Sequence, residues 1–175
     1  MGRVIPFKVE YWEGQLYKSD RASAIVGAAL LDEELENLLR SFFVDKPKVV
    51  DKLIRDGGPM GSFGMRIRFS YALGLLPETI FHDLKLVQKV RNFFAHTSRD
   101  VEMNHKKLAG LISSFKAPEW VGEPEDPDPD SPRGRFHTTV RSLLWDLAST
   151  AIDLSSKQRR EIPEDFFPFG DRDGI

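Results

Sequence analysis

Two residue types suited to chemistry on a phosphodiester, an arginine and a histidine, lie five positions apart in the segment Arg91-Asn92-Phe93-Phe94-Ala95-His96. A histidine titrates near neutral pH and can remove the proton of a ribose hydroxyl. An arginine can stabilise the negative charge that gathers on phosphate oxygens. The pair therefore offers a general base and a group that stabilises negative charge, with Asn92 as a further polar group.

A structural interpretation of Arg91 competes with the catalytic one. From Pro77 onward, apolar residues recur at helical spacing, and Arg91 projects into their stripe. A buried guanidinium needs a partner, or it must line a pocket open to a ligand or a second subunit. Asp32, inside the apolar stripe of an earlier helix, is the first candidate partner. Asp83 is the second, but it lies about 12 Å away along the same helix. We expect a buried Asp32–Arg91 pair, with His96 at the helix C-terminus, and prefer it to catalysis.

The end of this helix decides whether the arginine and the histidine can meet. In a continuous helix, five positions turn the side chain by about 140°, which separates Arg91 from His96. The polar run Thr97-Ser98-Arg99-Asp100 favours an end near Ala95.

Two further arginines, Arg66 and Arg68, interrupt a helix that is otherwise apolar nearly all round. They are candidates for a contact with a phosphate or a partner, although extension of their side chains to the helix edges is the simpler interpretation. The other histidines show no metal-ligand spacing, and we expect neither a metal nor a cofactor.

The step between helices at Gly74 resembles a helix-turn-helix superficially. The turn that would face DNA carries Glu78, Thr79 and Asp83, and acidic residues there do not suit a phosphate backbone. The sequence therefore argues against direct DNA binding.

The pattern of apolar residues predicts an all-α fold, a single-domain bundle of five to seven helices. The expected helices cover about residues 19–44, 48–55, 63–73, 77–95, 101–115 and 136–156. Between the last two, residues 117–135 form an acidic, proline-rich stretch that we interpret as a surface loop. Residues 1–18 are expected to be a short lead-in, and residues 162–175 an aromatic tail.

The bulk composition limits the classes of protein. The chain has 175 residues, 41% of them hydrophobic, no cysteine and a formal net charge of −2. These values indicate one globular domain of residues 1–175, without disulfides or thiolate metal sites. No apolar run is long enough for a signal peptide or a membrane span, so we expect a cytoplasmic protein.

Four segments together resemble the mannitol operon repressor family of bacterial regulators. The segments begin with Ser19-Asp20-Arg21-Ala22 leading into ALLDEELENLLR, and continue with GGPMGSFGMRIRFSYALGLL (57–76), HDLKLVQKVRNFFAH (82–96) and RGRFHTTV (133–140). The resemblance implies a helical, non-enzymatic transcriptional regulator without a DNA-reading motif. It also implies a protein partner in transcription or sugar-uptake regulation, and we expect a homodimer.

The Arg91…His96 spacing is also similar to the R-x4-6-H signature of the HEPN superfamily. That resemblance implies an alternative function as a metal-independent endoribonuclease or RNA-binding module, in which two protomers bring their motifs together. Arg91 and His96 would carry the function, and Asn92 fills the polar position after the arginine. A third possibility is that the chain keeps such a fold for interaction alone.

Overall fold

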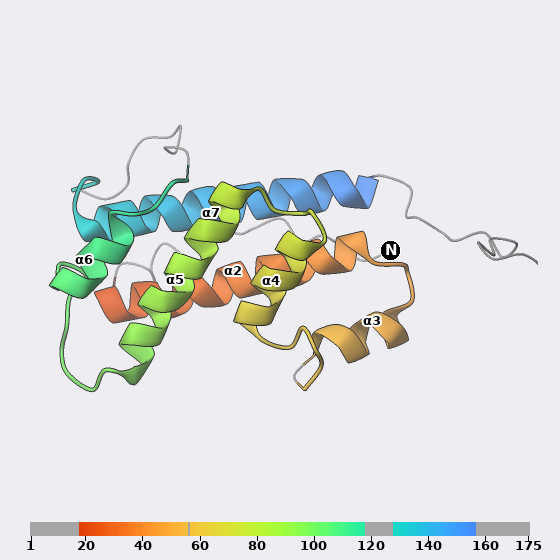
Figure 1. Ribbon diagram of the computed structural model, residues 1–175, viewed down its shortest axis with the longest axis horizontal. Helices are drawn as coiled ribbons and strands as arrows, with labels where there is room; N and C mark the ends of the chain where they lie inside the picture. Colours follow the sequence, from red (N-terminus) through yellow and green to blue (C-terminus); the bar gives the residue numbers. More distant parts are fainter. Residues whose placement is uncertain (1–17, 56, 118–127, 157–175) are drawn as a thin grey trace, which may run out of the picture.

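The computed structural model describes residues 18–55, 57–117 and 128–156, and over these residues it is entirely α-helical (Figure 1). This confirms the predicted all-helical bundle. The helices are α2 (Asp20–Phe42), α3 (Pro47–Ile54), α4 (Phe63–Ala72), α5 (Glu78–His96), α6 (Lys106–Ile112) and α7 (Pro132–Ser156).

The two longest helices, α2 and α7, lie side by side and run in the same direction, while α4 and α5 pack across α2 (Figure 1). Their apolar faces form one main core, to which α6 contributes Leu108 and Ile112. The core includes fully buried Leu31, Leu35 and Phe94. Burial of side chains of this size is the main favourable contribution to folding.

Helix α2 begins where the sequence predicts. Ser19 occupies the N-cap position, and its hydroxyl accepts a hydrogen bond from the backbone N–H of Ala22 at 3.1 Å. This bond satisfies one of the free donors of the first turn. The helix then presents a continuous row of buried residues to α5 and α7, from Ala24 to Leu39.

A second, smaller core holds α3 against the end of α2. It consists of Leu39, Val50, Ile54 and Met60. After α3 the chain turns at Gly57-Gly58-Pro59, where Gly57 has a φ of +87°, which side chains rarely adopt. Gly74, with a φ of +72°, ends α4 in the same way.

Two predicted boundaries are wrong. Helix α6 begins at Lys106 rather than Val101, because Asp20 accepts a hydrogen bond from the Met103 N–H at 2.6 Å and holds the preceding residues in turns. Helix α7 begins at Pro132, inside the stretch expected to be a loop. Its start has a physical cause: the Ser131 hydroxyl accepts from the Gly134 N–H at 3.0 Å, and proline suits the first helical position.

The predicted lead-in and aromatic tail lie outside the described residues, as does most of the acidic stretch. Within the described residues, no helix is long and apolar enough to cross a membrane.

Candidate functional site

Arg91 is exposed on α5, where its Nη1 donates to Oδ1 of Asn92 at 3.1 Å. The prediction of a buried Asp32–Arg91 pair is therefore wrong. Around α5, Arg91 points between Ile80 and Leu84, which are both buried. It lies further along the helix, where this side of α5 lines a groove that is open to solvent.

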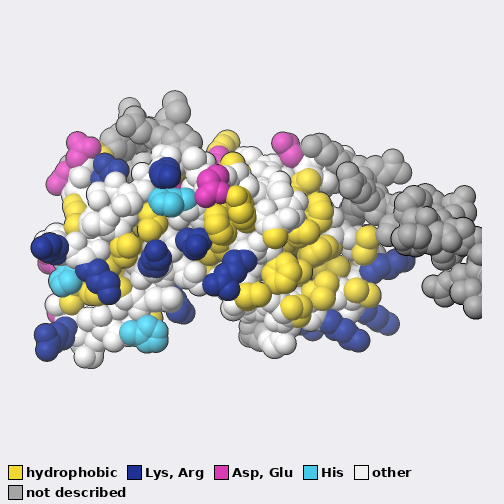
Figure 2. All heavy atoms as spheres, in the orientation of Figure 1, with side chains coloured by type: hydrophobic (Ala, Val, Ile, Leu, Met, Phe, Trp, Pro, Cys, Tyr) yellow, Lys and Arg dark blue, Asp and Glu magenta, His cyan; other side chains and the backbone are white. Residues whose placement is uncertain are grey.

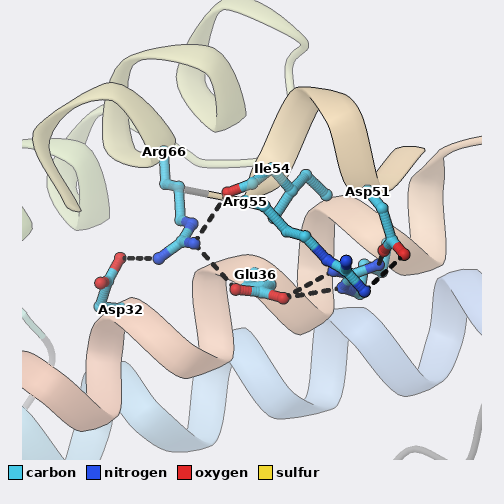
Figure 3. Close-up of polar contacts among 7 residues, drawn as sticks. Asp32, Glu36, Asp51, Ile54, Arg55 and Arg66 are labelled. Atoms are coloured by element: carbon cyan, nitrogen blue, oxygen red, sulfur yellow. Dashed lines mark hydrogen bonds and ion pairs between the residues drawn. The ribbon is translucent and has the colours of Figure 1, made fainter. Parts of the chain in front are cut away.

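Arg66 on α4 is the buried arginine, with 7% of its surface exposed. Its Nη1 donates to Asp32 Oδ1 at 2.6 Å, and its Nη2 donates to Glu36 Oε2 at 2.8 Å and to the carbonyl of Ile54 at 3.1 Å (Figure 3). Asp32 does need a cationic partner, as its position in the apolar stripe indicates, but α4 supplies it rather than α5. Arg66 thus links α2, α3 and α4.

The ion pairs continue from Glu36 toward α3 (Figure 3). Glu36 Oε1 accepts from Arg40, whose Nη1 contacts Asp51 Oδ1 at 2.8 Å, and Asp51 Oδ2 contacts Arg55 at 2.9 Å. Burial lowers the pKa of Arg40, but its bonds to Asp51 and Glu36 outweigh burial and raise it overall. The hydrogen bond from Arg40 holds the pKa of the Asp51 carboxyl below its usual range. Arg40 and Asp51 are both charged at neutral pH.

Asp32 and Arg91 share a groove between α2, α4 and α5 without forming an ion pair among the contacts of the described residues. The groove has a volume of about 390 Å³. Its lining consists of Ile25, Ala28, Ala29, Asp32, Ser62, Phe63, Gly64, Gln88, Arg91 and Asn92. The sequence therefore brings Asp32 and Arg91 to the same part of the molecule, on a surface that is open to solvent.

The helix carrying the motif continues to His96, one residue beyond the predicted end. Because Arg91 and His96 belong to one continuous helix, their side chains leave it in directions about 140° apart. Both are exposed. Within one chain, the pair is not assembled as a catalytic site.

Arg68 is exposed, and its Nη1 approaches Met65 Sδ at 3.9 Å. The histidines have separate surroundings: His82 contacts Asp83 at 2.8 Å, His105 caps α6, and His137 contacts the Ser23 hydroxyl at 2.9 Å. The described part of the chain contains no group of three histidine or acidic residues placed to hold a metal ion.

One positioning residue, Arg21, was missed by the sequence analysis, and a second, Asp83, was named there only as a candidate partner for Arg91. Arg21 on α2 donates to the carbonyls of Phe94, Thr97 and Arg99, and so fixes the end of α5. A basic residue in the first turn of a helix gave no signal for this role, because its acceptors lie more than 70 positions away in the sequence. Asp83 is fully buried, and its oxygens accept from the backbone N–H groups of Lys116, at 2.8 and 2.9 Å, and of Ala117.

Comparison with known proteins identifies a matching family and a similar solved structure. Residues 17–148 match a protein family described as mannitol repressor. A solved structure described as the X-ray structure of the MtlR-HPr complex from Escherichia coli is similar with a TM-score of 0.56 and 18% identity, and the match covers 83% of this chain and 99% of that chain. At this identity the likeness shows a shared fold. No curated protein matches the sequence.

Proposed function

Because the chain belongs to the mannitol repressor family, we propose that it is a non-enzymatic transcriptional regulator that acts in the cytoplasm through protein–protein contacts. The match over residues 17–148 is the observation that carries this proposal. The first turn of α5 supports action without DNA reading, because it begins with Glu78 and carries no basic residue.

The partner we propose is HPr, which the similar Escherichia coli structure contains. The chain offers an apolar surface suited to a protein partner. Exposed hydrophobic side chains follow the junction of α2 and α3, at Phe42, Val44 and Val49, and the end of α4, at Tyr71 and Leu73. Figure 2 shows hydrophobic side chains gathered over α4 and toward this end of the molecule. Aromatic and aliphatic groups of this kind form the centres of protein interfaces.

Isothermal titration calorimetry of the full chain with purified HPr tests the proposal. Val49 is 57% exposed on α3, and we expect Val49→Asp to weaken binding at least tenfold by placing a charge in a desolvated contact. Ile152→Asp, on α7 and also exposed, is the matched control and should leave the affinity within twofold. Absence of HPr binding by the unmodified chain would contradict the choice of partner.

We further propose that the regulator is a homodimer, in agreement with the sequence expectation. Sedimentation equilibrium of the full chain measures this directly, alone and with HPr. A mass corresponding to one chain at every concentration would contradict the dimer and leave the HPr test unaffected.

A further inference from the structure

We propose that the exposed basic face of α5 and α6 binds a nucleic-acid strand through its phosphates. We define this basic face by the exposed side chains Lys85, Lys89, His96, His105, Lys106 and Lys107. Figure 2 shows lysine and arginine side chains gathered over α5 and α6, with little acidic surface among them. The proposed regulator would thus hold a strand on one surface and a protein on another.

Few acidic side chains lie close enough to the basic face to neutralise its positive charges. Between Thr79 and Arg99 the one acidic residue is Asp83, which is buried and bonded to backbone N–H groups. None of the four lysines of the face forms an ion pair among the described residues. Four exposed cations without counter-charges attract a polyanion, whose condensed counterions are released on binding.

Acidic residues flank the basic face without entering it. Glu78, at the start of α5, accepts a hydrogen bond from the Tyr71 hydroxyl. Asp100 and Glu102, in the α5–α6 connection, line a pocket together with Asp20 and Arg21. The lysines of the basic face therefore lie on α5 and on the first turn of α6, between these acidic residues.

Two lysines of the face lie over aromatic rings. Lys85 Nζ is 5.1 Å from the centre of the Phe81 ring, and Lys107 Nζ is 5.6 Å from the centre of the Phe93 ring. Phe81 stacks on Tyr71 with ring centres 4.1 Å apart, and Phe93 lies 5.4 Å from the ring of His105. Twelve residues of helix separate the two phenylalanines, or about 18 Å. These contacts hold two cations at fixed positions on the basic face, along which the backbone of an extended nucleic-acid strand can lie.

The composition of the face favours nucleic acid over an acidic protein. Lysine is depleted at the centres of protein interfaces, where apolar and aromatic side chains predominate. Here the side chains that define the basic face are exposed lysines and histidines, whereas the exposed large hydrophobic residues lie at the α2–α3 junction, on α4 and on α7. Lysine binds a phosphate as a point charge and reads no base. We therefore expect binding with little dependence on sequence.

Fluorescence anisotropy of labelled 20-nucleotide strands with the full chain tests the proposal at 50 mM salt. The probes are single-stranded RNA, single-stranded DNA of the same sequence, and the DNA duplex, and their order of affinity identifies the natural source of the phosphates. Lys85→Glu/Lys89→Glu should weaken binding at least tenfold. It should also reduce the slope of log affinity against log salt for single strands by about 1.4, the value for two lost phosphate contacts.

Lys48→Glu/Lys52→Glu on α3 is the matched control, because it makes the same charge change at two exposed positions away from the basic face. Binding within twofold of the unmodified chain is expected. Circular dichroism melts verify that both double variants fold. An equal loss in the two variants would show a net-charge effect alone, and would overturn the proposal.

Two further results would also overturn it: no binding of any strand at 50 mM salt, or tighter binding of a polyglutamate peptide than of every strand, which would indicate an acidic protein partner. Titration with HPr distinguishes this inference from the proposed function. The Lys85→Glu/Lys89→Glu variant should bind HPr as the unmodified chain does.

Discussion

At the residue scale, the arginine that matters for folding is the one whose own guanidinium is buried. Arg66 is buried with two carboxylates and a carbonyl, whereas Arg91 is exposed beside an amide. Desolvating a guanidinium is costly unless its hydrogen bonds are replaced. Arg66 meets that condition except at Nε, which has no hydrogen-bond partner.

Replacing Arg66 should therefore cost far more than replacing Arg91. We expect Arg66→Met to lower the free energy of unfolding by about 2–3 kcal/mol, because it leaves Asp32 and Glu36 close together without their cation. The carboxylates keep some access to water, which moderates the loss. Arg91→Met should change stability by less than about 0.5 kcal/mol. Urea denaturation measures both values, and equal losses would contradict the assignment.

A buried carboxyl on α2 gives a pH-dependent prediction. Burial raises the pKa of Glu34; a hydrogen bond with Asn37 lowers it, and the charge of Glu33 raises it further, so that the net direction is upward. The folded state then holds the proton more tightly than the unfolded state. The contribution of Glu34 is greatest below the ordinary value of 4.5 and is lost as the pH rises through the raised pKa.

The substitution Glu34→Gln keeps the shape and removes this titration. We expect the variant to be more stable than the unmodified chain at pH 7, with the difference shrinking toward pH 4. Thermal melts from pH 4 to 7 measure the trend. Glu33→Gln, at an exposed position on the same helix, is the control, and a larger pH effect there than at Glu34 would refute the assignment.

At the element scale, a single carboxylate joins α5 to the segment that follows α6. Asp83 accepts from the N–H groups of Lys116 and Ala117 and contacts His82. The Asp83 oxygens take the place of the carbonyl acceptors that these two N–H groups would have in a helix. Charged acceptors form stronger hydrogen bonds than neutral ones.

Asp83→Asn should therefore weaken the attachment of the segment that follows α6, and of that segment alone. An amide offers one acceptor oxygen and turns an N–H₂ group toward backbone donors, so we expect a loss of about 2 kcal/mol. Hydrogen exchange of the Lys116 and Ala117 amides should accelerate. Val50 in α3 should exchange as before, and Asp153→Asn, at an exposed position of α7, should change neither. Unchanged protection at Lys116 would disprove the anchoring role.

Helix positions could be predicted from the sequence wherever a local signal marks them. Ser19 before α2, Gly74 after α4 and the regular apolar spacing of α5 place those helices within two residues. Helix α6 was predicted too long because its start depends on a distant carboxylate, Asp20. A contact between residues far apart in the sequence produces no periodic pattern from which it could be predicted.

The candidate site shows the same limit. The apolar stripe of α2 correctly indicates that Asp32 needs a cation. The choice between Arg66 and Arg91 depends on how α4 and α5 cross α2: the side of α5 that buries Ile80 and Leu84 lines an open groove at Arg91. Sequence spacing gives the side of a helix on which a residue lies, but not which part of that side another helix covers.

At the scale of the whole molecule, the surfaces for different partners are separate. Hydrophobic side chains gather over α4 and the end of α2, and basic side chains over α5 and α6 (Figure 2). The family match ends at residue 148, within α7, and covers all of the elements that carry both surfaces. The two proposed binding surfaces therefore both lie within the part of the chain that matches the family.

The separation of Arg91 and His96 within one chain leads to the last prediction, that the protein leaves single-stranded RNA intact. Nuclease activity would require a second copy to place its His96 beside Arg91, because one continuous helix directs the two side chains apart. Incubation of labelled RNA with the full chain and a chelator, followed by gel electrophoresis, measures this. Incubation with the His96→Ala variant should likewise leave the RNA intact, and the substitution should change the free energy of unfolding by less than about 0.5 kcal/mol.

Chelator-resistant cleavage that disappears in His96→Ala and in Arg91→Met would instead establish the endoribonuclease alternative. Cleavage that persists in both variants would point to a contaminating enzyme. Strand binding by the basic face without cleavage agrees with both proposals, since His96 of that face is held apart from Arg91 by one continuous helix.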